Sequence, residues 1–301
     1  MLKKCKPFIL FGLVVLVISI IAACGSKNDE GQTEEVGKAI DYTITGIEPG
    51  AGITTLTEKA LEDYSNLEGY SLEESSTAAM LTSLDEAIDK EEPIVVTGWT
   101  PHWKFAKYDL KFLEDPEGSF GKAENINTIT RLGLEEDMPE AYTVLDRFYW
   151  EVEDMESVML MTQEKDMSFK EAADQWIEEN EDKVAEWTEG IDKVDGQEIE
   201  LVSTPWDTER ASTSVVANVL TSLGYEVTDT PVDPAVMFQA VATNDADASV
   251  APWLPETHGS FYEEYKGKVT DLGPNLEGAK LGLVVPAYME IDSIEDLKPN
   301  K

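Results

Sequence analysis

The chain has 301 residues, of which 61 are acidic and 23 are basic, and its formal net charge at pH 7 is −38. Nucleic-acid binding requires a basic surface that neutralises phosphates, so this composition excludes nucleic acid as a partner. The acidic residues are spread along the chain, which indicates a solvated acidic shell, and the length suffices for a large core or two lobes.

The first 24 residues predict a secretory signal peptide. Three lysines precede an uncharged apolar run over residues 7–21, and small residues then lead to Cys24. This pattern is typical of a cleaved signal at residues 1–23, and an uncleaved membrane anchor is the alternative. A cysteine at the cleavage site resembles the lipobox of bacterial lipoproteins, which implies that Cys24 is lipidated and holds the protein at the outer face of the cell membrane. Residues 24–39 are polar and predict a flexible tether.

Strand-like and helix-like segments alternate after the tether, which indicates an α/β architecture. In the first half we expect strands at residues 42–47, 70–73 and 93–97, and helices at residues 53–64 and 77–88. A turn-rich segment that ends in Gly52 precedes the first helix, and Trp99 follows the third strand in a Trp-x-Pro segment. This half therefore predicts one β-α-β-α-β unit.

The second half repeats this order. We expect strands at residues 198–202, 225–228 and 246–250, helices at residues 213–223 and 235–242, a further strand at 280–286 and a helical turn at 294–297. Trp206 follows the first of these strands, and Trp253 follows the third, again in Trp-x-Pro. Two units that end alike predict a pseudo-symmetric pair of α/β lobes with a cleft between them. Lobe 1 is expected at residues 40–122, joined by a C-terminal segment at about 289–301, and lobe 2 at residues 123–288.

The segment between the two units, residues 128–190, is helix-rich. Its aromatic residues recur at helical spacing with other apolar side chains, which is typical of a core. We therefore interpret Trp176 and Trp187 as core residues, together with the apolar patch that begins at residues 148–150.

Three of the seven tryptophans differ from this pattern. Trp99, Trp206 and Trp253 each lie just past an expected strand and next to glycine or proline. In open α/β sheets, ligands bind outside the ends of the strands. Several indole faces around one small space suit a cation without N–H donors, such as a quaternary ammonium. The sequence therefore predicts a cage of three indoles in the cleft.

Motifs for catalysis or metal binding are missing from the sequence. It contains no G-x-S-x-G, H-E-x-x-H or G-x-x-x-x-G-K-[ST] segment, and its two histidines, His102 and His258, are far apart. Cys5 would leave with the signal and Cys24 would carry the lipid, so no cysteine remains for a disulfide or as a nucleophile. We expect no enzymatic activity, no metal and no cofactor.

A zwitterionic quaternary amine also needs donors for its carboxylate. Gly52 and Ile53 lie where a turn-rich loop meets a helix, so free backbone N–H groups and the helix dipole point outward. His258 lies five residues past Trp253, close enough to serve the same ligand. Taken alone, the Gly52 loop is also consistent with an ordinary turn, and His258 with a solvated loop residue.

Four stretches carry a family resemblance: residues 46–53, 98–103, 206–207 and 253–258. Together they resemble the glycine betaine-binding lipoproteins of Bacillus OpuA-type ABC transporters, and the similarity runs through nearly the whole chain in the same order. The resemblance implies a periplasmic-binding-protein-like fold with two lobes that close on ligand. It further implies that Trp99, Trp206 and Trp253 surround the trimethylammonium group, and that the ligand's carboxylate is held by the Gly52 and Ile53 amides and the His258 ring.

We therefore expect an extracytoplasmic, monomeric substrate-binding lipoprotein that captures glycine betaine for osmoprotection. Its partners would be the permease and ATPase of an ABC importer, and the membrane through the lipid anchor. Choline, carnitine or another quaternary amine is an alternative ligand. A surface sugar-binding protein or enzyme is a second alternative, but the tryptophan loops lack the polar side chains that sugars require.

Overall fold

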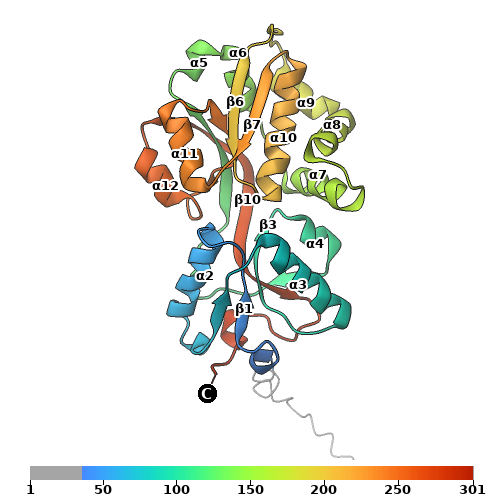
Figure 1. The fold of residues 1–301 in the computed structure, drawn as a ribbon, viewed down its shortest axis with the longest axis vertical. Coiled ribbons are helices and arrows are strands. Elements are labelled where there is room, and N and C mark those ends of the chain that lie inside the picture. The colour runs from blue at the N-terminus through green and yellow to red at the C-terminus, as the bar shows by residue number, and fades with distance from the viewer. Residues whose placement is uncertain (1–35, 301) are drawn as a thin grey trace, which may run out of the picture.

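The chain forms two α/β lobes, which follow one another along the long axis of the molecule (Figure 1). The computed structural model describes residues 36–300, so the signal peptide, Cys24 and most of the tether lie outside the described residues. The predicted two-lobed α/β fold is confirmed. Within residues 36–300, no helix has the length and apolar character needed to cross a membrane.

Lobe 1 contains a parallel sheet in the order β2-β1-β3. Ser76 begins the second helix of this lobe by accepting a hydrogen bond from the Ala79 N–H at 3.1 Å, and Glu91 ends it in the left-handed conformation at φ 52°. The elements expected in this half are all present, with shifted boundaries. They are β1 (Thr43–Thr45), α2 (Gly52–Asp63), η1 (Ser65–Leu67), β2 (Ser71–Glu73), α3 (Thr77–Lys90) and β3 (Val96–Thr100), followed by α4 (Trp103–Lys107) and β4 (Leu110–Phe112).

Lobe 2 contains a second parallel sheet with the equivalent order, β7-β6-β8. Its repeating unit is β6 (Glu198–Ser203), α10 (Asp207–Ser222), β7 (Glu226–Pro231), α11 (Pro234–Thr243) and β8 (Ala248–Ser249). The lobe also contains β5 (Glu124–Arg131), α5 (Leu134–Asp137), α6 (Pro139–Arg147), α7 (Val152–Glu164), α8 (Phe169–Glu179), α9 (Glu181–Thr188), β9 (Trp253–Leu254) and α12 (Gly259–Tyr265). In both lobes the first strand of the unit lies in the middle, and the third strand pairs with an antiparallel neighbour. The topology thus has the predicted pseudo-symmetry.

One long strand, β10 (Val269–Pro286), connects the lobes (Figure 1). Residues 269–279 pair with β5 in lobe 2, and residues 280–286 pair with β3 and β4 in lobe 1. The chain therefore returns to lobe 1 before residue 288, where the sequence places the boundary, because a single strand runs from one sheet into the other. A 3-10 helix, η2 (Ile294–Asp296), then packs on lobe 1.

Sequence reasoning misses β5 and the first half of β10. Residues 269–279 include Gly273, Pro274 and Gly278, a composition typical of turns. Register shifts interrupt the β5–β10 pairing at three places in this segment. The first half of β10 is a strand because it pairs along most of β5. Local composition does not reveal such pairing.

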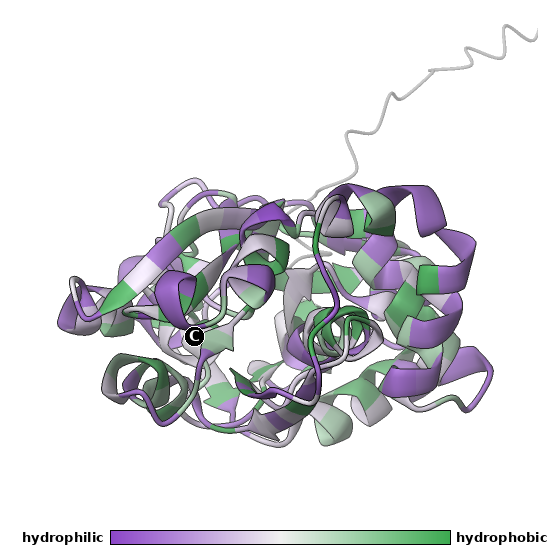
Figure 2. Ribbon diagram, turned by 90° about the horizontal axis from the view of Figure 1, so that it is seen from above, coloured by the Kyte–Doolittle hydropathy of each residue, from purple (hydrophilic) through white to green (hydrophobic). Residues whose placement is uncertain are grey.

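Helices α7, α8 and α9 lie together on one side of lobe 2 (Figure 1), where Trp176 of α8 and Trp187 of α9 pack with Trp150, which precedes α7. The Trp150 and Trp176 ring centroids are 5.7 Å apart, and those of Trp176 and Trp187 are 6.0 Å apart, with all three side chains buried. The interpretation of Trp176 and Trp187 as core residues is confirmed. Figure 2 shows hydrophilic and hydrophobic residues alternating along the peripheral helices, as expected for helices that turn one face to a core.

Candidate ligand-binding site

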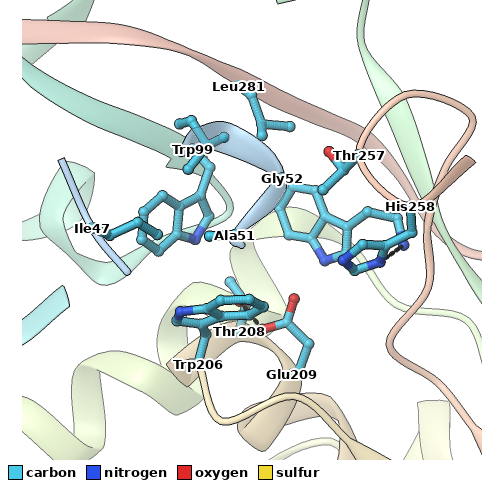
Figure 3. A pocket seen from close by; sticks show the side chains of 12 residues that line it. Ile47, Ala51, Gly52, Trp99, Trp206, Thr208, Glu209, Thr257, His258 and Leu281 are labelled. Carbon is cyan, nitrogen blue, oxygen red and sulfur yellow. Dashed lines mark hydrogen bonds between the residues drawn. The ribbon is translucent and has the colours of Figure 1, made fainter. Parts of the chain in front are cut away.

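A small cavity lies between the lobes, and both lobes line it (Figure 3). All six residues that the sequence predicts to bind ligand are part of its lining. The residues from lobe 1 are Ile47, Ala51, Gly52, Ile53, Trp99 and Leu281, and those from lobe 2 are Trp206, Thr208, Glu209, Trp253, Thr257 and His258.

The three cavity tryptophans come from both lobes. Trp99 lies in β3 opposite Leu281 of β10, and Trp253 lies in β9 opposite Ile126 of β5; both are buried. Trp206 is the half-buried N-cap residue of α10. The expectation that all three lie on loops is therefore right for Trp206 and wrong for the other two, because β10 and β5 extend the strand pairing to them.

His258 contributes a ring N–H group to the cavity. Its Nδ1 accepts a hydrogen bond from the Trp253 backbone N–H at 3.0 Å, so the neutral ring carries its proton on Nε2. This Nε2 is buried and has no hydrogen-bond partner within residues 36–300. Burial lowers the pKa of His258 to about 4, which keeps the ring neutral at physiological pH. Since buried donors are normally paired, this N–H suits an acceptor on a ligand.

The N-terminus of α2 offers further donors. Its N-cap residue, Ala51, has no side-chain capping hydrogen bond. The N–H groups of Gly52 and Ile53 make no hydrogen bond with the described residues, and both residues line the cavity. The first N–H groups of a helix have no partner within the helix and lie at the positive end of its dipole, so this place suits an anion.

Glu209 also lines the cavity, and the sequence does not single it out among 61 acidic residues. Its side chain is buried, and its Oε2 accepts a hydrogen bond from the Thr208 hydroxyl at 2.5 Å. Burial raises the pKa of Glu209 to about 7. Only a correct start for α10, which the sequence does not mark, would have placed it in the first turn of that helix. The helix begins directly after Trp206, which puts Glu209 in its first turn, whereas the sequence predicts helix from residue 213.

Contacts between the lobes hold them together around the cavity. The Trp103 indole N–H of lobe 1 donates to Asp207 of lobe 2 at 3.0 Å, and the Trp206 indole N–H donates to Glu48 of lobe 1 at 3.4 Å. Gly52 lies so close to Thr257 that a Cβ at position 52 would be 2.4 Å from the Thr257 Cγ2. The structure therefore has the lobes closed, and the absence of a side chain at Gly52 permits this approach.

The chemistry of the cavity suits a small zwitterion. The indoles of Trp99, Trp206 and Trp253 line the cavity together with N–H groups of His258 and α2 that have no partner among residues 36–300. Within residues 36–300, no group of three or more histidine, cysteine, aspartate or glutamate side chains is arranged to hold a metal ion.

A family model described as the substrate binding domain of ABC-type glycine betaine transport system matches residues 26–179 and 197–301. The chain belongs to this family. The glycine betaine/carnitine transport binding protein GbuC of Listeria monocytogenes is 51% identical over 299 residues, which cover 98% of this chain and 99% of the relative. These findings confirm the resemblance predicted from the motifs.

Two solved structures are similar to parts of the chain. Lactococcal OpuAC, in its closed-liganded conformation with glycine betaine, is 51% identical over 50% of this chain and 58% of that chain, with a TM-score of 0.48. The glycine betaine/L-proline-binding protein ProX from Borrelia burgdorferi is 35% identical over 52% of this chain and 60% of that chain, with a TM-score of 0.45. Each match spans less than two thirds of the solved chain.

Proposed function

We propose that this protein captures glycine betaine between its lobes and delivers it to an ABC importer. The observation that carries the proposal is that one cavity holds groups for both poles of this ligand. The indoles of Trp99, Trp206 and Trp253 suit the trimethylammonium group. The His258 Nε2–H and the amides at the start of α2 suit the carboxylate. Membership of a transport-system family and similarity to GbuC support the same ligand class.

The indoles suit the cation on physical grounds. A trimethylammonium group has no N–H, so ordinary hydrogen bonds cannot hold it, whereas an indole face attracts it through its quadrupole. Each such contact contributes about 0.5–1 kcal/mol at an exposed site and roughly 2 kcal/mol or more when desolvated. Trp99 and Trp253 are 6% and 3% exposed, so they represent the desolvated case.

The unpaired donors favour a betaine over choline. If the bound ligand has no acceptor near His258, the buried Nε2–H of this histidine stays without a hydrogen bond, which costs about 1–3 kcal/mol. Choline has no carboxylate and should bind more weakly for this reason. Carnitine and other betaines keep the carboxylate and remain alternative ligands, and carnitine appears in the name of GbuC.

The proposal includes the location of the protein. The mature chain would be a monomer that performs no chemistry, carries its lipid on Cys24 and uses residues 24–39 as a tether on the outer face of the membrane. Mass spectrometry of the mature N-terminal peptide checks this, because an unmodified Cys24 would contradict the anchor.

Calorimetric titration of the purified mature protein with glycine betaine and with choline tests the function. We expect saturable glycine betaine binding, which His258→Ala should weaken about tenfold or more through loss of a charge-assisted hydrogen bond. Choline binding should change much less, and thermal unfolding of the variant verifies its fold. Absence of binding at millimolar glycine betaine would contradict the function, and equal losses for both ligands would contradict the role of His258.

A further inference from the structure

Glu209 is a buried carboxyl group on the cavity wall, and the two poles described above leave it without a role. It lies in the first turn of α10 and is 3% exposed. Figure 3 shows its carboxyl group directed into the space between Trp206 and His258. An ionised carboxylate in such a desolvated place is unfavourable unless a cation faces it.

The groups that contact Glu209 are neutral. The Thr208 hydroxyl donates to its Oε2. Burial raises the pKa of Glu209, and the Thr208 hydroxyl lowers it in part. None of the salt bridges within residues 36–300 includes Glu209.

The charged and titratable groups on the elements next to Glu209 contact other residues. Arg210, the next residue of α10, places its guanidinium 4.5 Å from the Phe169 ring centroid. Asp229 of β7 and Asp207 of α10 each accept a hydrogen bond from another side chain. The His258 ring is neutral because it is buried. The described residues therefore place no cation against Glu209.

We propose that Glu209 is the counter-charge for the ligand's quaternary ammonium, and that it selects ligands by charge as the indoles select them by shape. The inference rests on the proposed function, because it assumes that the indoles enclose this cation. Trp206 and Trp253 line the cavity with Glu209, so a cation held by their faces lies in the field of its carboxylate. The attraction is stronger here than in water because the effective dielectric of a closed cavity is low.

Ligand binding is then linked to the protonation of Glu209. The cation favours the ionised carboxyl group, so the pKa of Glu209 is lower in the complex than in the free protein. Above a pH of about 7 the free protein already carries the carboxylate, and affinity is at its maximum. As the pH falls below this value, binding must displace a proton, and affinity decreases by at most about tenfold per pH unit. His258, with a pKa of about 4, does not titrate in this range.

The test compares glycine betaine with 3,3-dimethylbutanoate, in which carbon replaces the quaternary nitrogen. The two ligands share their shape and carboxylate and differ by one positive charge. Both are titrated into the wild type, Glu209→Gln and Glu156→Gln. Glu156 is a half-buried carboxyl group on α7 outside the cavity lining, which makes Glu156→Gln the matched control.

At pH 8 we expect Glu209→Gln to weaken glycine betaine binding about tenfold or more and to leave 3,3-dimethylbutanoate binding unchanged or tighter. Glu156→Gln should keep the wild-type ratio of the two affinities. Glycine betaine affinity of the wild type should fall about tenfold from pH 8 to pH 6, and that of Glu209→Gln should stay flat.

Equal losses for both ligands in Glu209→Gln would overturn the inference, because a structural role does not distinguish the charge. A wild-type affinity that is flat between pH 8 and pH 6 would also overturn it. In both cases wild-type binding of glycine betaine leaves the proposed function intact. Absence of that binding would instead contradict the proposed function.

Discussion

The two lobes present equivalent elements to the cavity and equip them with different chemistry. In each lobe the first helix of the repeating unit, α2 or α10, has its N-terminus at the cavity, and the third strand is followed by a tryptophan or contains one. The N-terminus of α2 offers the free amides of Gly52 and Ile53, whereas that of α10 carries Trp206 and Glu209. Lobe 1 thus presents helix N–H groups to the cavity, and lobe 2 presents a carboxyl group beside Trp206 and Trp253.

The charged groups beside Trp99 in lobe 1 and Trp253 in lobe 2 also differ. In lobe 1, the Lys104 Nζ lies 4.0 Å from the Trp99 ring centroid, and Lys104 is fully buried. Burial lowers the pKa of Lys104 well below its usual value. In lobe 2, Trp253 has the Glu209 carboxyl group near its indole N–H. A cation is therefore attracted more strongly by lobe 2, and we expect the ligand to bind lobe 2 first and lobe 1 to close on it.

Removing one indole from each lobe in turn tests whether the lobes contribute differently to binding, and it should cause the largest loss of affinity. Trp253→Ala should weaken glycine betaine binding by about 2 kcal/mol or more, roughly thirtyfold, because a desolvated cation–π contact is lost. Trp99→Ala should also weaken binding, but mainly through faster dissociation, because the contacts of lobe 1 form after the ligand has bound lobe 2. Stopped-flow tryptophan fluorescence measures both rate constants.

Trp187→Phe serves as the control for the two alanine variants. Trp187 belongs to the core of lobe 2 and does not line the cavity, so both rate constants should keep their wild-type values. If Trp99→Ala and Trp253→Ala slowed association equally, the lobes would not engage the ligand in the order that we infer.

A methyl group at Gly52 tests the contribution of lobe closure alone, because it opposes closure without removing a ligand contact. Its Cβ would lie 2.4 Å from the Thr257 Cγ2 and 3.1 Å from the Thr257 carbonyl oxygen, so the lobes must move apart slightly. We expect Gly52→Ala to weaken binding about tenfold, as overpacking typically costs about 1–3 kcal/mol. The thermal unfolding of the free protein should change little, because the clash occurs between lobes.

Gly259→Ala is the matched control for this substitution. Gly259 also begins a helix, and a Cβ there would have no atom within 4 Å. Calorimetry gives the affinities, and small-angle scattering with ligand reports closure. Unchanged affinity in Gly52→Ala would show that lobe closure does not depend on the tight approach at Thr257.

Much of the fold could be predicted from the sequence because its signals are local. The helices α2 and α3 follow from apolar spacing, and the parallel strands from short apolar runs next to turns. The strand β5 and the first half of β10 have no such signal, because they depend on pairing with each other although they lie far apart in the sequence. The switch of β10 from one sheet to the other is likewise a tertiary feature.

The site divides in the same way. Motifs and the ends of expected strands predict the positions of the three cavity tryptophans, Gly52 and His258. Glu209 has no local signature in a chain this acidic, and the mainly polar residues 207–212 lack the apolar spacing that would mark the start of α10. Its burial comes from segments distant in the sequence, such as the one that carries Trp253 and His258. The contact of Gly52 with Thr257 is also invisible in the sequence, since it joins residues from different lobes.

Removing the hydrogen bond from Trp103 to Asp207 should have the smallest effect on ligand binding. It joins the lobes at 3.0 Å, and neither residue lines the cavity, so it acts on closure alone. Asp207→Ala removes the acceptor and should speed ligand dissociation up to about fivefold, equivalent to about 1 kcal/mol. Asp207→Asn keeps an oxygen acceptor and should lose less. If Asp207→Ala instead slowed association, the hydrogen bond would form before the ligand is enclosed, and lobe 1 would take part in the first encounter.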